Sequence, residues 1–264
     1  VLPVSNLLET PSLFAKNALG DLLLPAFLQF LLQFVGLCAL LFLFNKTGRS
    51  VFQLLEEKLG SFVLKGVYSL LAVYYLFSAL LPILDVEKFI HAVFYDTEPS
   101  RFTFTAFFFL SAFACVKSLR SFARITDLCL PVFLISFLGI ILMSVGKSDF
   151  ESLLPWFEFP ASKIVNAVKN TTLHFSDALL LLPFLSNSDY KKGDGKKVMA
   201  SFGLGAVFVL LFLTTFYGIY TTIAPRQHYA FSKIAQYFSA LKTVGRIDLL
   251  LVYLLTAILL LATI

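Results

Sequence analysis

The chain has 264 residues, of which 58% are hydrophobic, 14% are charged and 31 are phenylalanine. This apolar fraction exceeds what a soluble core of this length can bury, so the composition excludes an ordinary soluble domain and predicts a polytopic membrane protein. The net charge of +5 does not indicate a nucleic-acid partner, because lysine and arginine at membrane faces are its ordinary cause.

Apolar segments long enough for membrane helices recur along the chain, and the short alternating segments of a membrane barrel are absent. Residues 1–20 mix polar, turn-forming and apolar residues, which is typical of the end of a helix followed by a loop. The predicted spans then follow at 21–44, 61–84, 102–116, 125–145, 170–183, 198–223 and 247–264. The sequence therefore predicts an all-α, polytopic transmembrane helix bundle that forms a single domain over residues 1–264.

The connectors between the spans differ from one another. Residues 51–59 and 226–242 each place apolar side chains on one helical face, which predicts amphipathic helices at the membrane surface. We expect an acidic-leaning loop at 85–101 and a longer connector at 147–169.

Basic residues are concentrated in alternate connectors. Lysine and arginine cluster at 45–49, 117–124 and 189–197, whereas the intervening connectors carry the acidic residues Asp85, Glu87, Asp96, Glu98, Asp149, Glu151 and Glu158. Short basic loops remain on the cytoplasmic side of a membrane. We therefore expect these three connectors in the cytoplasm and the acidic ones outside.

No catalytic arrangement is present in the sequence. It contains no phosphate-binding glycine loop and no metal-ligand spacing, so we expect neither enzyme activity, nor a metal site, nor a cofactor. The three cysteines, Cys38, Cys115 and Cys129, lie in or beside apolar runs, and we interpret them as reduced packing residues.

The segment 170–183 places a carboxylate and an imidazole inside an apolar run. An ionisable group at membrane depth costs at least about 2.5–3.5 kcal/mol on insertion scales, so Asp177 is not expected to face lipid. One interpretation gives Asp177 and His174 a role in binding. The alternative is that Asp177 bonds a neighbouring hydroxyl or lysine as a packing device and that His174 lies in a wet vestibule without a role.

Five short motifs, in this order, resemble the spore-germination permease family, the B subunits of GerA-type nutrient germinant receptors. Each motif is short, and their order along the chain is the stronger indication. They are RITDLCLP at 124–131, LLPW at 153–156, DALLLLP at 177–183, AP at 224–225 and GRID at 245–248.

The resemblance implies the LeuT-like inverted-repeat fold of the amino acid, polyamine and organocation transporter superfamily, with ten helices in two sets of five. The chain would hold the end of helix one through helix eight. Val1 is not an initiator methionine, and the last apolar run has no polar exit. We therefore expect a domain that is incomplete at both ends.

In that fold the ligand site lies near the membrane midplane, where helices one and six unwind. Hydroxyl side chains that bond their own backbone ease such a break. Phe175 occupies the place of a glycine in the family-like pattern, which predicts a smaller or less unwound pocket. The resemblance thus implies ligand-binding roles for Asp177, His174, Ser176 and Thr171, for Tyr74 and Ser78 on the third helix, and for Tyr253 on the eighth.

The alternative for Tyr74 and Tyr253 is that they are packing residues without a ligand contact.

Arg124 and Asp127 lie at the expected cytoplasmic mouth of helix five. They are candidates for an ion pair that stabilises a gate, although an anchor in the basic cytoplasmic face is the simpler explanation.

The function implied by the resemblance is that of a membrane subunit of a spore nutrient-germinant receptor. The subunit would lie in the lipid of the spore inner membrane and bind a small nutrient, such as an amino acid. Binding would change the arrangement of its helices, and this change would be transmitted to A-type and C-type receptor subunits. One alternative is a proton-coupled amino acid transporter in the bacterial cell membrane. Another is a scaffold or ion-conducting piece without a ligand site.

Overall fold

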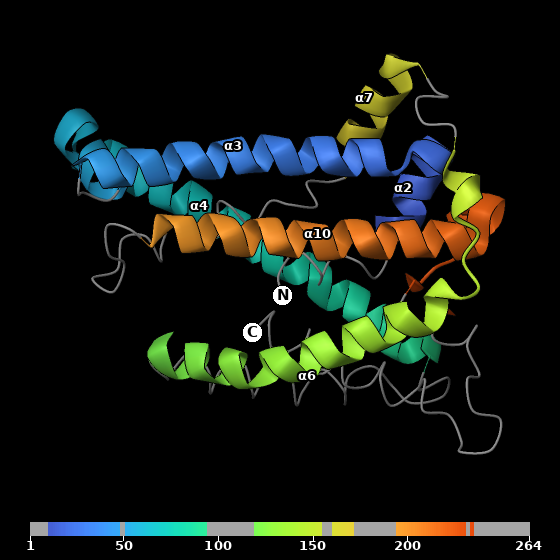
Figure 1. Ribbon diagram of the computed structural model, residues 1–264. Helices are drawn as coiled ribbons and strands as arrows, with labels where there is room; N and C mark the ends of the chain where they lie inside the picture. Colours follow the sequence, from blue (N-terminus) through green and yellow to red (C-terminus); the bar gives the residue numbers. More distant parts are fainter. Residues whose placement is uncertain are drawn as a thin grey trace.

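The computed structural model describes residues 10–47, 51–93, 119–154, 160–171, 194–230 and 233–234. Every regular element within these ranges is a helix (Figure 1). The prediction of an all-α fold is therefore confirmed for this part of the chain. The elements are α2 (Thr10–Ala18), η1 (Leu19–Asp21), α3 (Leu23–Thr47), α4 (Val51–Val93), α6 (Leu119–Val145), η2 (Phe150–Leu153), α7 (Ala161–Asn170), α10 (Gly195–Tyr220) and η3 (Thr221–Arg226).

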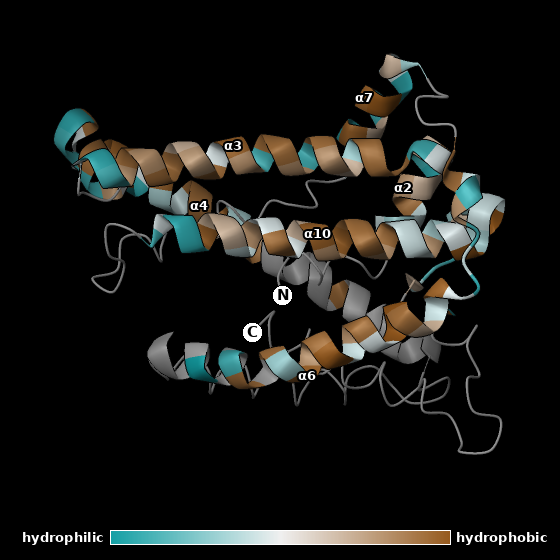
Figure 2. Ribbon diagram, in the orientation of Figure 1, coloured by the Kyte–Doolittle hydropathy of each residue, from teal (hydrophilic) through white to brown (hydrophobic). Residues whose placement is uncertain are grey.

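Three of the described helices are long and apolar enough to cross a membrane. They are α3, the first part of α4, and α10 with its continuation into η3. The segment Leu130–Val145 of α6 is a shorter apolar helix. Figure 2 shows these apolar residues running along α3, α6 and α10. The predicted spans at 102–116 and 247–264, and the predicted span at 170–183 beyond Thr171, lie outside the described residues.

A sharp kink at Gly60 divides α4 into two helices. The backbone there has φ 83° and ψ 164°, a conformation that is essentially restricted to glycine. The apolar segment that is long enough to cross a membrane, Phe52–Phe77, includes this kink, so the helix changes direction within it. The predicted break between the helix at 51–59 and the helix from residue 61 is confirmed, whereas the location of residues 51–59 at the membrane surface stays a prediction.

Helices extend into several segments that we expected to be connectors or loops, and the connector expected at 147–169 contains η2 and α7. Residues 10–18 form α2, in which Pro11 lies in the first turn, where a missing N–H leaves no hydrogen bond unmade. The loop expected from residue 85 is wrong as far as Val93, because α4 continues through a stretch without glycine or proline. Likewise, α6 begins at Leu119, inside the expected basic connector.

Phenylalanine rings join α3 to α10. Phe30 and Phe34 stack on Phe202, with ring centroids 5.7 Å and 6.5 Å apart. One turn of helix further along, Cys38 Sγ lies 3.5 Å from Met199 Sδ. The two helices lie side by side and run in opposite directions (Figure 1). Stacked aromatic pairs and a soft sulfur contact thus fix the spacing of the two most apolar helices.

The helix α6 packs against α10 around the buried ring of Phe137. Phe137 is fully buried and packs edge-on against Phe208 at 5.6 Å and tilted against Phe212 at 5.8 Å. Burial along α10 increases toward its C-terminal end, where Phe212, Leu213 and Phe216 are all fully buried. The packing is therefore tightest at one end of the bundle.

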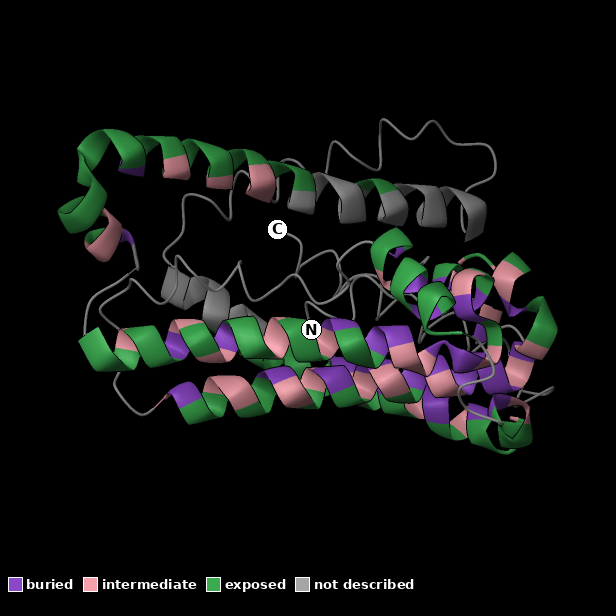
Figure 3. Cartoon of the chain, turned by 90° about the horizontal axis from the view of Figure 1, so that it is seen from above, coloured by how far each residue is buried: buried purple, intermediate pink, exposed green. Residues whose placement is uncertain are grey.

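That end holds the elements that we call the cap: α2, η1, η2, α7 and η3. Figure 3 shows the buried residues gathered there. Asp149 N donates to Gly218 O at 2.8 Å, and a Cβ on Gly218 would lie 3.2 Å from Ser148 Cβ, so a glycine is needed for this close approach.

The helix ends that border the basic connectors lie at the opposite end of the bundle from the cap (Figure 1). The predicted orientation therefore places the cap on the side of the membrane that faces away from the cytoplasm.

Replacing Gly60 with alanine should destabilise the protein by about 1–3 kcal/mol, because the kink requires a positive φ. A Cβ at Gly60 would meet nothing within 4 Å, so the loss would come from backbone strain alone. Gly66→Ala is the matched control, since Gly66 lies in the same helix and is equally open; it should stabilise by about 0.5–1 kcal/mol. Melting temperatures of the purified variants in detergent test this, and equal shifts for both would contradict it.

Candidate functional site

The described residues include only part of the predicted ligand site. Thr171 and Tyr74 are described with their side chains, and Ser78 is described only as part of α4. Asp177, His174, Ser176 and Tyr253 lie outside the described residues. Their roles stay predictions. What the structure shows is how the chain is held immediately before the segment that contains Asp177.

A single glutamine of α3 holds the end of α7. Gln29 is 3% exposed, and its Nε2 donates to Val168 O at 3.1 Å, to Thr171 O at 2.7 Å and to Thr171 Oγ1 at 2.9 Å. Two N–H groups thus serve three acceptors. Both carbonyls can only accept, so the amide nitrogen must be the atom that faces α7.

These bonds satisfy two carbonyls in the last turn of α7. The last carbonyls of a helix have no partner within it. Here Ala167 O accepts from the backbone N and from the side-chain Oγ1 of Thr171, and Gln29 bonds Val168 O. Thr171 is fully buried. The chain therefore enters the segment 172–183 from a point fixed by buried hydrogen bonds to another helix.

Thr171 has a different surrounding from the one we predicted for a ligand-binding residue. Its hydroxyl donates to Ala167 O and accepts from Gln29, so both its donor and one of its acceptor positions are used within the protein. In this structure Thr171 is a capping residue between α3 and α7. Its predicted contact with a ligand is not tested by these bonds.

Tyr74 is the described candidate with an unused polar group. Its Oη is buried and has no hydrogen-bond partner, while its ring packs edge-on against Tyr75 with centroids 5.8 Å apart. A buried hydroxyl left without a partner costs about 1–3 kcal/mol. Groups of this kind require an explanation, and a ligand contact is one that fits the predicted role.

The two candidate gate residues lie near the start of α6. Arg124 and Asp127 are both exposed and lie three residues apart on the helix. That spacing permits an ion pair, but the structure records none between these two described side chains. The positive-inside anchor remains the simpler explanation for Arg124.

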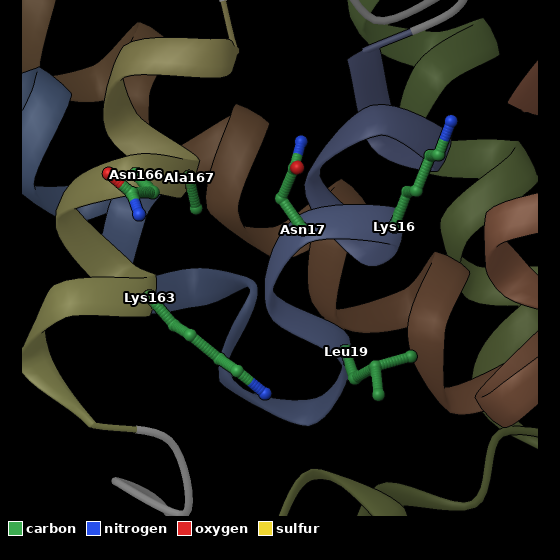
Figure 4. A pocket seen from close by; sticks show the side chains of 6 residues that line it. All are labelled: Lys16, Asn17, Leu19, Lys163, Asn166 and Ala167. Carbon is green, nitrogen blue, oxygen red and sulfur yellow. The ribbon is translucent and has the colours of Figure 1, made fainter.

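The cap contains a pocket of about 310 Å³ between α2 and α7 (Figure 4). Sequence reasoning did not predict it, because its two walls are separated by more than a hundred residues of chain. The sequence does show that Lys163 and Asn166 are three residues apart and so lie on the same polar face of an amphipathic helix. The described lining residues are Lys16, Asn17, Leu19, Lys163, Asn166 and Ala167.

Comparison with protein families identifies the chain. The family model described as spore germination protein matches residues 10–264. The chain belongs to the spore germination protein family. The resemblance drawn from the sequence motifs is thereby confirmed. A comparison with curated proteins finds no match, and neither does a comparison with solved structures.

Family membership and the apolar helices together assign this spore germination protein to the membrane. The family is one of germination permeases, which supports a transport or receptor role in germination rather than an enzymatic one. Three described helices can cross a bilayer. Among the described residues no group of three or more His, Cys, Asp or Glu side chains could hold a metal ion.

Replacing Gln29 with methionine should lower the stability of this germination protein by about 1–3 kcal/mol, because buried acceptors at the end of α7 lose their donor. Methionine also makes α3 more apolar, which would by itself favour insertion into the membrane. A fall in stability would therefore come from the lost hydrogen bonds. Gln33→Met is the control: Gln33 lies one turn further along α3, is half-buried, and makes no hydrogen bond to a described residue. Melting temperatures in detergent test this; a loss of equal size in both variants would remove the special role of Gln29.

Proposed function

We propose that this protein is a membrane subunit of a spore nutrient-germinant receptor, located in the spore inner membrane. It binds a small nutrient, with an amino acid as the expected class, in a transporter-like pocket and triggers germination. The observation that carries the proposal is the match of the germination family to residues 10–264. The LeuT-like arrangement of the helices and the A-type and C-type partner subunits are parts of the same proposal.

The hydrogen bonds of Gln29 support a route by which binding could be transmitted. Asp177 follows Thr171 by six residues in the chain, and Thr171 is bonded to α3. A nutrient bound by Asp177 would therefore contact a segment whose first residues are hydrogen-bonded to α3, so that a change in this segment could reach the helix bundle. Binding would shift the population between two arrangements of the bundle, provided that the contacts with the nutrient differ between them.

Transport of the nutrient with protons is the outcome that would replace this proposal. In that case Asp177 or His174 would carry the proton. Uptake into proteoliposomes driven by a pH gradient distinguishes the two functions, since a sensor binds without net flux.

Spores that carry Asp177→Asn should require at least about tenfold more nutrient for half-maximal germination, because the substitution removes the charge and keeps the shape. The measurement is loss of refractility against the concentration of an equimolar L-amino-acid mixture. Asp194→Asn is the control, since Asp194 pairs with exposed Lys197 at 3.1 Å in a surface ion pair, which contributes little. An unchanged response in Asp177→Asn spores, at equal protein level in the membrane, would count against a nutrient pocket at this segment.

A further inference from the structure

Residues with a strained backbone are concentrated at the cap. Positive φ is rare outside glycine, and for a β-branched or bulky residue it marks a genuine outlier. Among the described residues that are not glycine, three have positive φ: Leu19 at 41°, Thr221 at 43° and Tyr229 at 59°. The first two lie within the cap, and the third lies three residues after η3. The strain is therefore found at one end of the described bundle.

Thr221 lies at the joint between α10 and η3. Its N–H donates to Tyr217 O, which ends α10, and its backbone has φ 43° and ψ −123°. That combination lies outside the small left-handed region that residues other than glycine can enter. A β-branched side chain in such a conformation strains the backbone. The chain is thus forced into its change of direction at this joint.

Leu19 lies at the joint between α2 and α3. It begins η1, the short element between the two helices, and its carbonyl accepts from Leu22 N at 3.2 Å. The side chain of leucine makes no hydrogen bond that could favour positive φ, as that of asparagine can. At the next residue, Gly20, a Cβ would lie 3.6 Å from Ser152 O and 3.8 Å from Tyr217 Oη. This joint is therefore packed against η2 and against the end of α10.

The two joints connect one pair of cap elements to two membrane helices. The elements α2 and η3 pack against each other, and α2 lies between the ends of α3 and α10 (Figure 1). Phe14 and Ala15 of α2 and Ala224 of η3 are fully buried. Leu19 separates α2 from α3, and Thr221 separates η3 from α10. A joint movement of α2 and η3 would therefore change the backbone at both residues.

The cap contains space beside α2. The pocket of about 310 Å³ lies between α2 and α7, and Leu19 is one of its lining residues. Gln29 of α3 holds the end of α7, so this wall of the pocket is attached to a membrane helix. The space permits α2 to shift while α7 keeps its hydrogen bonds to α3.

We propose that Leu19 and Thr221 are a pair of hinges on which α2 and η3 move together relative to α3 and α10. Hinges are residues at the ends of elements that absorb a large change in φ and ψ. Strained residues persist where the surrounding packing holds them, and they cluster in segments that switch between arrangements. Here the buried contacts of the cap hold both residues at positive φ.

In the second arrangement both hinge residues take negative φ, so that release of strain offsets the contacts that α2 and η3 lose. A ligand that binds one arrangement better than the other would shift the balance between them. This proposal concerns the cap alone and does not depend on a nutrient site at Asp177.

The first test is the melting temperature of the full chain in detergent. Thr221→Gly removes strain from the arrangement described here, because glycine adopts positive φ freely. It should raise the melting temperature by about 2–6 °C. Thr222→Gly is the matched control, since Thr222 is the next residue, is exposed and does not have positive φ. There glycine adds only flexibility and should lower the melting temperature by about 1–4 °C.

Hydrogen–deuterium exchange distinguishes a pair of hinges from two independent strained turns. If α2 and η3 move as one unit, Thr221→Gly should slow the exchange of amides in 10–18 by at least about threefold. Leu19→Gly should likewise slow the exchange of amides in 221–230. Leu13→Gly is the control for Leu19→Gly, because Leu13 is 38% exposed against 37% and lies within α2 without positive φ. It should not slow the exchange of 221–230.

Slower exchange of both segments in both hinge variants, together with the higher melting temperature of Thr221→Gly, would support the proposal. Either of two results would overturn it. One is a melting temperature that does not rise with Thr221→Gly. The other is slower exchange confined to the element beside the substituted residue.

Discussion

The hydrogen bonds from Gln29 to the end of α7 are the constraint that attaches this wall of the cap to the helix bundle. A polar side chain on an otherwise apolar helix is stabilised when it meets acceptors that have no other partner. The carbonyls at the end of a helix supply such acceptors. Because Gln29 is buried and bonds both Val168 and Thr171, α7 is attached to α3 through buried polar contacts. Within the cap, α2 packs directly against this fixed α7.

The cap and the opposite end of the bundle differ in how tightly they are built. At the cap, buried aromatic residues of α10 pack against α2 and α6, and Gly218 allows close approach of the backbone at Asp149. Toward the other end, α4 turns sharply at Gly60 and the side chain of Phe62 is 90% exposed. In a membrane, lipid or further helices would cover such a surface. Among the described residues, the tightest packing of the bundle is therefore at the cap.

Sequence reasoning succeeded where a single local signal determines structure. The break at Gly60 and the positions of α3 and α10 followed from apolar run length and turn-forming residues. It failed where helices extend beyond their apolar part, as at Asp85 in α4, because an apolar run predicts the part of a helix that lies in the membrane and does not predict where the helix ends. The contact of Gln29 with Thr171 spans 142 residues of chain, and the pocket joins α2 to α7. No local pattern contains such pairings, so only the folded chain reveals them.

The central claim is that Gln29 fixes the helix end from which the segment with Asp177 begins. Hydrogen–deuterium exchange of the full protein in detergent measures this most directly, through peptides that cover 161–171 in the wild type and in Gln29→Met. If the claim holds, amides of α7 should exchange at least about tenfold faster in the variant, because a lost buried bond lowers the free energy of local opening by more than about 1.4 kcal/mol, while amides of α10 should be unchanged. Equal exchange of α7 in both proteins would contradict it.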